Sequence, residues 1–312
     1  MKTIQFMTSL RLNKLTCYLT LWLCICAPTL LAQLNHTDYK LYATATKSII
    51  DLDSLINSCA GADVIFFGEE HNDSVAHFLE TEIWKKLHNR YQRVCLSLEM
   101  FERDVQPTMN DYLSGLIREK NFLKDCRVWN NYRDYKPMVE YAKQNKLPVI
   151  CANAPGRYSN MAGRLGPGSL SEIDATSKKY IAPLPYALAG GGYFEKLTAL
   201  TSHGKDSTPM PATMNNFNMI AAQSLWDATM AYSIAQGLKA HKKTKVFHVN
   251  GRFHSDEHYA VVTQLKNYNA KAKCMVISCF RDDAFNEPNW EAWHKLGDYI
   301  IVTNPAVPTT YE

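Results

Sequence analysis

The chain has 312 residues, 46% of them hydrophobic, with 34 Lys and Arg against 30 Asp and Glu. Three of its four net positive charges lie in the first 32 residues, which leaves 31 basic against 30 acidic side chains over residues 33–312. This near balance excludes the strongly basic classes of protein, so we expect neither nucleic acid nor an anionic membrane surface as a partner. The remaining length is enough for one large α/β domain or two small ones.

The first 32 residues have the pattern of a secretory signal peptide. A mostly apolar run extends from residue 15 to residue 31, and no stop-transfer charges follow it. The run is preceded by three basic side chains, Lys2, Arg11 and Lys14. Ala32 places a small residue at the cleavage position, so the mature chain is predicted to begin at Gln33 and to be exported to the periplasm or the cell envelope. An uncleaved N-terminal anchor is the alternative.

Two cysteines in this leader, Cys24 and Cys26, raise the question of a lipid anchor. A lipoprotein signal has a small residue directly before the modified cysteine, whereas Leu23 and Ile25 stand there. We therefore expect membrane association only if the leader is retained or the chain is lipidated.

Six cysteines remain after residue 32, an even number that permits disulfides in an exported protein. Several lie in or next to apolar runs, where a free cysteine acts as a small hydrophobic side chain. None has the spacing of a thiolate zinc site. We expect mostly free thiols and at most one disulfide among Cys59, Cys95, Cys126, Cys151, Cys274 and Cys279.

Apolar runs rich in β-branched and aromatic residues are predicted to be strands, and the periodic stretches between them are predicted to be helices. The strands are 63–67, 93–98, 147–152, 245–249, 274–279 and 299–302, and the helices are 75–90, 107–120, 137–146, 217–241 and 255–268. This alternation predicts an α/β fold, a mostly parallel central sheet with helices on both faces.

Residues 156–214 interrupt the alternation. They are rich in Gly, Pro, Tyr and Met, and they contain no run that is typical of a core strand. We expect a helical and loop insertion that covers the edge of the sheet, within a single domain of residues 33–312. Residues 190–192, three glycines, are predicted to form a flexible turn, because no helix of the phosphate-binding kind is evident after them.

Carboxylates and imidazoles gather just after the predicted strands. Glu69 and His71 follow the first strand, Glu99 follows the second, and His254 follows the fourth. Because the carboxyl ends of parallel strands meet at one edge of a sheet, we expect these four side chains to converge. They could act as acid and base on a bound substrate, or His71 and His254 could hold a divalent metal.

Structural alternatives exist for these residues. Glu69 could cap the helix that follows it, although a cap does not need His71. Glu99 would be costly at the end of a buried strand without a partner, which favours a functional role.

Two further histidines have contrasting contexts. His258 lies four residues after His254, so a helix over 255–268 would place both imidazoles on one face and on one ligand. His248 lies inside a predicted strand, and we expect it to be packed in the core.

Polar side chains also occur on one face of the longest predicted helix. Gln223, Trp226 and Asp227 share that face at a spacing of three and four residues. We expect Asp227 to pair with an arginine, either Arg157 or Arg252, and to orient it toward the edge of the sheet. A partly exposed polar pair is the alternative.

Five segments of the chain together resemble the ChaN family of haem-binding uptake proteins in the Tiki superfamily. They are Gly68 to Asp73 with His77, Ser97 to Phe101, Asn153 to Tyr158, Gln223 to Ala231, and Asn250 to His254 with Asp256 and His258. They occur in the family's order and span nearly all of the mature chain. The resemblance implies an α/β core with a helical insertion, an exported location, and haem bound near the edge of the sheet, with a homodimer as a possible arrangement.

The resemblance also suggests residues that would hold haem. The candidate axial ligands are Tyr158, Tyr193 and His254. Side chains that could pair with the propionates are Arg157, Arg164 and Lys178. The remaining candidate cofactor-binding residues are Gln223, Asp227 and His258.

The wider superfamily provides a second hypothesis, a hydrolase. It includes metal-dependent proteases and erythromycin esterases, whose Gly-x-x-His element and acidic residues correspond to 68–71 and Glu99 in this chain. In this interpretation Glu69, His71, Glu99 and His254 activate a water molecule, with or without a divalent metal, to cleave an ester or an amide. The first hypothesis is an exported haem-binding protein that serves haem and iron acquisition.

Overall fold

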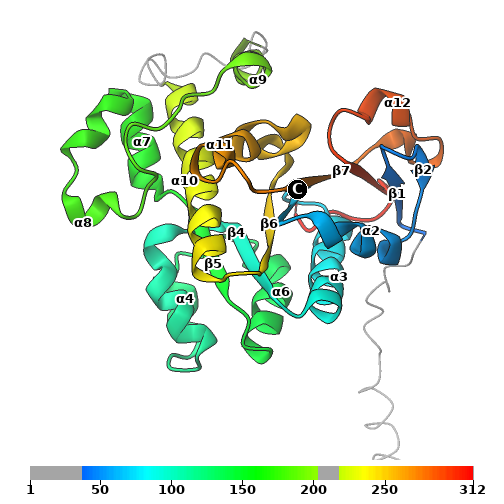
Figure 1. The fold of residues 1–312 in the computed structure, drawn as a ribbon, viewed down its shortest axis with the longest axis horizontal. Helices are drawn as coiled ribbons and strands as arrows, with labels where there is room; N and C mark the ends of the chain where they lie inside the picture. Colours follow the sequence, from blue (N-terminus) through cyan, green and yellow to red (C-terminus); the bar gives the residue numbers. More distant parts are fainter. Residues whose placement is uncertain (1–36, 203–217, 312) are drawn as a thin grey trace, which may run out of the picture. The chain divides into compact units, whose positions relative to one another are not determined.

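The computed structural model describes residues 37–202 and 218–311 (Figure 1). The predicted signal peptide and residues 203–214 of the predicted insertion lie outside this range. The described strands form one eight-stranded sheet in the order β2-β1-β8-β7-β3-β6-β4-β5. They are β1 (Tyr39–Ala43), β2 (Ser48–Ile49), β3 (Val64–Glu69), β4 (Val94–Glu102), β5 (Val149–Asn153), β6 (Lys245–Gly251), β7 (Cys274–Arg281) and β8 (Tyr299–Thr303). The α-helices are α2 (Leu52–Ser58), α3 (Ser74–Tyr91), α4 (Gln106–Leu113), α5 (Glu119–Asp125), α6 (Tyr132–Gln144), α7 (Gly156–Leu165), α8 (Ala175–Lys178), α9 (Gly191–Ser202), α10 (Met219–Ala240), α11 (Ala260–Tyr268) and α12 (Trp290–Trp293).

The six strands β3, β4, β5, β6, β7 and β8 are parallel to one another. Strand β1 is antiparallel to both of its neighbours, β2 and β8. Every residue of β3 is buried. Strands covered on both faces have continuous apolar runs rather than alternating ones, which is why the sequence located them. The prediction of an α/β fold with a mostly parallel sheet is confirmed.

Helices cover both faces of this sheet. Phe66 and Phe67 are neighbours in β3 and therefore point to opposite faces. Phe66 belongs to the core cluster that includes α10 and α11. Phe67 contacts Phe247 of β6, on which Trp84 of α3 stacks with ring centres 6.3 Å apart. Burial of each such side chain contributes about 1.5–3 kcal/mol, and the two packed layers fix the positions of the strand ends.

Three predicted helical or turn segments have different bounds. The helix expected over 107–120 is divided into α4 and α5, because the chain turns at Gly115, where φ is +74°. The helix expected from 137 begins at Tyr132, so that Pro137 lies in its second turn. The prediction of a flexible turn at 190–192 is wrong, since α9 begins at Gly191. Strands β1 and β2 were not predicted, because β1 (YKLYA) is not a continuous apolar run and β2 has only two residues.

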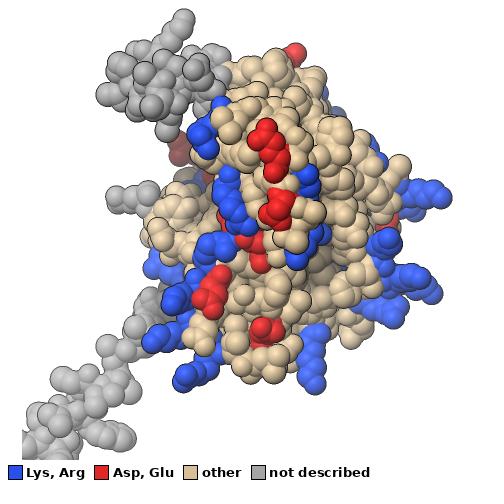
Figure 2. All heavy atoms as spheres, turned by 90° about the vertical axis from the view of Figure 1, so that its left-hand side faces the viewer, with Lys and Arg blue, Asp and Glu red and all other residues tan. Residues whose placement is uncertain are grey.

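The insertion packs on α10. Tyr158 and Ala162 of α7, together with Tyr186, form a hydrophobic cluster with Ala221 and Leu225 of α10. No segment of the insertion within the described residues adds a strand to the sheet. Figure 2 shows the face that carries α7 and α8, where basic and acidic side chains are interspersed.

One side chain, that of Gln106, hydrogen-bonds two backbone groups of the edge strand β5. The Nε2 of Gln106, in the first turn of α4, donates to the carbonyl of Val149 (2.8 Å), and its Oε1 accepts from the N–H of Cys151 (2.8 Å). An unpaired strand edge is a template for pairing with another chain. Gln106 removes two of the free groups that such pairing would use.

His248 lies in the core, as its position inside a predicted strand indicated. His248 is fully buried and accepts or donates a hydrogen bond at Nδ1 with the hydroxyl of Ser97 (2.9 Å), while burial lowers the pKa of His248 to about 3. The six cysteines after residue 32 are all free. Within the described residues no helix combines the length and the hydropathy needed to cross a bilayer.

Candidate functional site

The carboxyl ends of β3, β4 and β6 bring the site together. β6 lies between the other two strands. In the register of the sheet Glu69 is opposite Gly251, and Leu98 is opposite Val249. After Gly251 the chain enters a short 3-10 turn, Arg252–His254. We call the four side chains at this edge the rim cluster: Glu69, His71, Glu99 and His254.

Two glycines allow the turns after β3 and β6 to approach each other. A Cβ on Gly68 would lie 2.8 Å from the Cα of Arg252. A Cβ on Gly251 would lie 2.9 Å from Nε2 of His71 and 3.8 Å from Oε2 of Glu99. His71 and Glu99 therefore border the same stretch of backbone, and a larger residue than glycine would displace the imidazole.

Glu69 orients the imidazole of His71. The Nδ1 of His71 donates to Oε1 of Glu69 (2.8 Å), which also accepts from the hydroxyl of Tyr135 (2.7 Å). The Glu69 side chain is fully buried, whereas that of His71 is 36% exposed. Burial would raise the pKa of Glu69, but the hydrogen bond from His71 and the close imidazole of His77 hold that pKa below its ordinary value. The rim cluster thus contains an ionised carboxylate behind a partly exposed imidazole.

A second imidazole, that of His254, is held by a carboxylate of α10. Its Nδ1 donates to Oδ1 of Asp227 (2.6 Å), and the hydroxyl of Tyr193 donates to Oδ2 of the same carboxylate (2.8 Å). The Nε2 of His254 lies 3.5 Å from Oε1 of Glu99, whose Oε2 accepts from the N–H of Gly251 (2.7 Å). Burial would lower the pKa of His254, but Glu99 and Asp227 outweigh it and raise that pKa to about 9. His254 is therefore an imidazolium at neutral pH.

The prediction that Asp227 pairs with an arginine is wrong. Arg157 pairs with Asp104 (2.7 Å), and Arg252 pairs with Asp256 (3.0 Å). Burial raises the pKa of Asp227, and the nearby imidazolium opposes that shift. An imidazole compensates this carboxylate because the turn after β6 directs His254 toward α10, whereas Arg252 of the same turn pairs with Asp256.

The prediction that His254 and His258 share a helix face is also wrong. Helix α11 begins only at Ala260, because Glu257, His258 and Ala260 have φ values of 60°, 60° and 45°. The Nε2 of His258 lies 3.1 Å from Oδ2 of Asp298, the residue before β8. The two imidazoles therefore have separate partners and do not face one ligand.

The other predicted cofactor-binding residues are dispersed. Tyr158 is buried between the insertion and α10, and the guanidinium of Arg157 lies 4.5 Å from its ring centre. Gln223 lies one turn before Asp227 on α10, and its Oε1 is buried without a hydrogen-bond partner. Tyr193 reaches the rim cluster only through Asp227. The structure thus brings Tyr193, Asp227 and the rim cluster together and places Arg157 and Tyr158 elsewhere.

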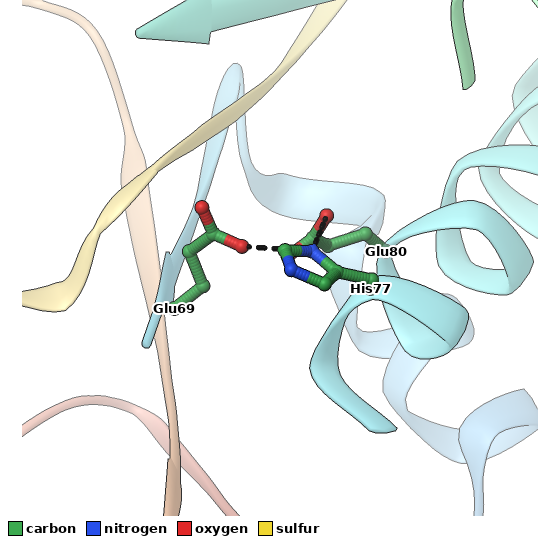
Figure 3. Close-up of side chains that lie close together, drawn as sticks. All are labelled: Glu69, His77 and Glu80. Carbon is green, nitrogen blue, oxygen red and sulfur yellow. Dashed lines mark hydrogen bonds and ion pairs between the residues drawn. The ribbon is translucent and has the colours of Figure 1, made fainter. Parts of the chain in front are cut away.

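A buried group that the sequence did not reveal lies behind the rim cluster (Figure 3). This buried triad comprises Glu69 of β3 with His77 and Glu80 of α3. The Nδ1 of His77 lies 3.1 Å from Oε2 of Glu69 and 3.4 Å from Oε2 of Glu80. Burial would lower the pKa of His77, but Glu80 and Glu69 outweigh it and raise that pKa to about 12, while burial and Glu69 raise the pKa of Glu80. The sequence contains one indication of this group: Glu80 follows His77 by three residues, which places both on the same face of a predicted amphipathic helix.

The rim cluster has the groups required for acid–base chemistry or for ligation of a metal. An imidazole whose Nδ1 is held by a carboxylate has a more basic Nε2, which suits His71 to accept a proton or to ligate a metal. The imidazolium of His254 is suited to donate a proton or to stabilise negative charge.

The fold and the rim cluster define an α/β protein with a glutamate and histidine site at the ends of its parallel strands. A sequence model of the family described as haem-binding uptake, Tiki superfamily, ChaN matches residues 55–265. The chain belongs to this family, as its resemblance in five segments predicted. No curated protein sequence matches the chain.

One solved structure of similar fold agrees with this result. A Campylobacter jejuni structure described as cofacial haem binding to ChaN has a TM-score of 0.64 at 16% identity, over 86% of this chain and 98% of that one. A Bacillus cereus protein has a TM-score of 0.48 at 11% identity, over 84% of this chain and 94% of that one. An erythromycin esterase mutant in its open conformation has a TM-score of 0.46 at 11% identity, over 86% of this chain and 83% of that one. The last two likenesses are too weak to support a conclusion about fold or function.

Proposed function

We propose that this protein binds haem at the rim cluster and serves haem and iron acquisition outside the cytoplasm. The observation that carries the proposal is membership of the haem-binding uptake family over residues 55–265. The C. jejuni protein of similar fold is described as binding haem cofacially.

The described residues around His71 suit a haem ligand. The ring of Trp129 lies edge-on to the imidazole at 5.2 Å, and the Nδ2 of Asn131 donates to the carbonyl of His71 (3.2 Å). Asn131 also lines an open groove of about 500 Å³ with Asn130, Arg133 and Tyr311. Small-molecule sites have volumes of this order, and the largely exposed Arg133 could pair with a propionate.

We assign the axial ligand to His71. When bound, haem would supply its iron, for which His71 offers a ring nitrogen supported by the carboxylate of Glu69. Tyr193 is less suited, because burial and Asp227 raise the pKa of Tyr193 and oppose formation of the tyrosinate. Tyr158 is buried in the hydrophobic cluster between the insertion and α10.

The test is a haem titration of residues 33–312, followed by absorbance in the Soret region. We expect a saturable, shifted band with about one haem per chain. His71→Ala should weaken binding by roughly tenfold or more, whereas His294→Ala, an exposed imidazole after α12, should have no effect. Absence of a saturable band would overturn haem binding. Loss of the band in Tyr158→Phe or Tyr193→Phe, with His71→Ala unaffected, would move the axial ligand to that tyrosine.

One observation favours a second function, hydrolysis of an ester or an amide. The chain of contacts from Tyr193 through Asp227 and His254 to Glu99 is more elaborate than a ligand-binding surface requires. In this proposal His71 takes a proton from water and the imidazolium of His254 donates one to the leaving group. In a metal-dependent version the two imidazoles would instead be neutral and would hold a divalent metal, which would activate the water.

The two functions respond differently to Glu99→Gln. This substitution keeps the shape of the side chain and removes its charge. It should abolish hydrolysis in a panel of ester and peptide substrates and leave haem affinity nearly unchanged. Wild-type protein without any turnover in that panel would exclude the hydrolase for those substrates.

Export and assembly are separate parts of the proposal. Residues 1–32 support export, and N-terminal sequencing of protein secreted by a bacterial host should begin at Gln33.

A homodimer that shares haem is supported by the cofacial description of the C. jejuni protein. Light scattering with and without haem should then show a haem-dependent doubling of mass, and an unchanged mass would exclude it.

A further inference from the structure

The buried triad contains more acid than base. Its side chains are 0%, 5% and 0% exposed for Glu69, His77 and Glu80. No Lys or Arg of the described part of the chain pairs with any of the three. Glu69 contacts two further ionisable groups, since its Oε1 accepts from Nδ1 of His71 (2.8 Å) and from the hydroxyl of Tyr135 (2.7 Å). On the other side lies another acid, Asp134, whose Oδ2 is 3.9 Å from Nε2 of His77. Two buried carboxylates around one imidazole need either a further proton or a cation between them, since a buried unpaired carboxylate is costly.

Oε1 of Glu80 is fully buried without a hydrogen-bond partner. Oε2 of Glu69 is also buried without a hydrogen bond, although it forms an ion pair with Nδ1 of His77 (3.1 Å). The Nδ1 of His77 carries at most one hydrogen and hydrogen-bonds only to Oε2 of Glu80 (3.4 Å). Buried polar atoms without partners are rare in native proteins, and an ion is one of the standard explanations for them.

The orientation of His77 is that of a metal ligand. Its Nε2 donates to the carbonyl of His71 (3.1 Å), which fixes the ring and leaves Nδ1 facing the two carboxylates. Histidines that ligate metals commonly donate their other ring N–H to a carbonyl or a carboxylate in this way.

We propose that Glu69, His77 and Glu80 form a closed site for one divalent transition-metal ion, with Zn²⁺ as the probe. Ligand atoms about 2.0–2.2 Å from a tetrahedral metal lie about 3.3–3.6 Å apart. The distances from Nδ1 of His77 to Glu69 and Glu80, 3.1 and 3.4 Å, are close to this spacing. One atom from each of the three side chains lies within 4.8 Å of the others. An imidazole with two carboxylates favours a transition metal over Ca²⁺ or Mg²⁺.

The position of this site connects it to the rim cluster. Glu69 has one oxygen on the triad and the other on His71, so a metal would hold this carboxylate ionised and fix the orientation of His71. The ion would also link β3 to α3 and stabilise the turn between them. It is structural and closed, distinct from a metal on His71 and His254.

The experiment is metal analysis of the full chain produced with added Zn²⁺, by mass spectrometry, together with thermal melting before and after unfolding and refolding in a chelator. We expect about one Zn²⁺ per chain and a lower melting temperature for the chelated protein, restored by Zn²⁺ during refolding. His77→Gln and Glu80→Gln should lose the metal. His88→Gln, on the same helix but bonded to Tyr141, and His254→Gln, in the rim cluster, should retain it.

Two results would overturn the proposal. Wild-type protein that holds no Zn²⁺, with melting unchanged by chelator, would mean that a proton shared by Glu69 and Glu80 neutralises the triad. Loss of Zn²⁺ in His254→Gln with retention in Glu80→Gln would place the metal at the rim. The wild-type measurement stands even if a variant fails to fold, and it uses no haem, so it is independent of the proposed function.

Discussion

Asp227 and His254 meet across the space between helix α10 and the turn after β6, with Oδ1 of the carboxylate 2.6 Å from Nδ1 of the imidazole. Both side chains are buried, at 1% and 9% exposed. The contact ties the helix that carries the insertion to the turn that carries the rim cluster.

The stability of the protein should depend on pH through this pair. The pKa of His254 is raised from 6.5 to about 9, so its contribution is fully present below pH 6.5 and is lost as the pH rises through 9. Burial raises the pKa of Asp227 as well, and this cost offsets part of the stabilisation by His254. The pair should therefore contribute on the order of 1–2 kcal/mol to the free energy of unfolding. Urea unfolding at pH 6.5, 8 and 9.5 should show this decline. Asp227→Asn should flatten it, and Asp125→Asn, an exposed carboxylate on α5, should not; equal slopes in all three proteins would contradict the assignment.

A methyl group at residue 251 should disturb His71 selectively. Gly251→Ala places a Cβ 2.9 Å from Nε2 of His71, so the imidazole must move away from its hydrogen bond with Glu69. We expect haem affinity to fall by roughly tenfold or more while the far-ultraviolet circular dichroism is unchanged. Gly61→Ala has no atom within 4 Å of the new Cβ and serves as the control. Unchanged haem affinity in Gly251→Ala would remove His71 from the haem site.

Tyr135→Phe should weaken the support of Glu69. It removes a hydroxyl that donates to the fully buried Oε1 at 2.7 Å, and loss of a hydrogen bond to a charged group costs about 1.5–3 kcal/mol. Chemical denaturation should report that loss of the free energy of unfolding. Tyr141→Phe, whose hydroxyl contacts only the half-buried His88, should cost less than about 1 kcal/mol. Equal costs for the two variants would show that the carboxylate does not depend on Tyr135.

The edge of the sheet gives a prediction away from the site. Gln106→Ala leaves the carbonyl of Val149 and the N–H of Cys151 without their side-chain partner, which should cost about 1–2 kcal/mol and promote association through β5. Analytical ultracentrifugation and urea unfolding measure both effects. Gln144→Ala, an exposed glutamine of α6, is the matched control, and indistinguishable behaviour of the two variants would argue against this role of Gln106.

The sequence located the six parallel strands because each is a short apolar run buried on both faces, and the residues that follow such strands must lie at one edge of the sheet. Glu69 and Glu99 could be placed at that edge for this reason. The partner of Asp227 could not be found, because it depends on which side chain of the turn after β6 faces α10. The positive φ values at 257 and 258 were equally invisible, and they separate His254 from His258.

The buried triad shows a further limit of sequence patterns. His77 and Glu80 lie in an amphipathic helix, where polar residues are expected on the exposed face. Only the packing of α3 against β3 and α6 shows that both face inward, toward Glu69 and Tyr135.

The free cysteines have a practical consequence for making the protein. Burial raises the pKa of all six thiols, which disfavours the thiolate needed for disulfide exchange. No covalent cross-link has to form for the described fold to be complete. Recombinant production therefore needs neither an oxidising compartment nor an isomerase, and reducing agents can be present throughout purification without loss of structure.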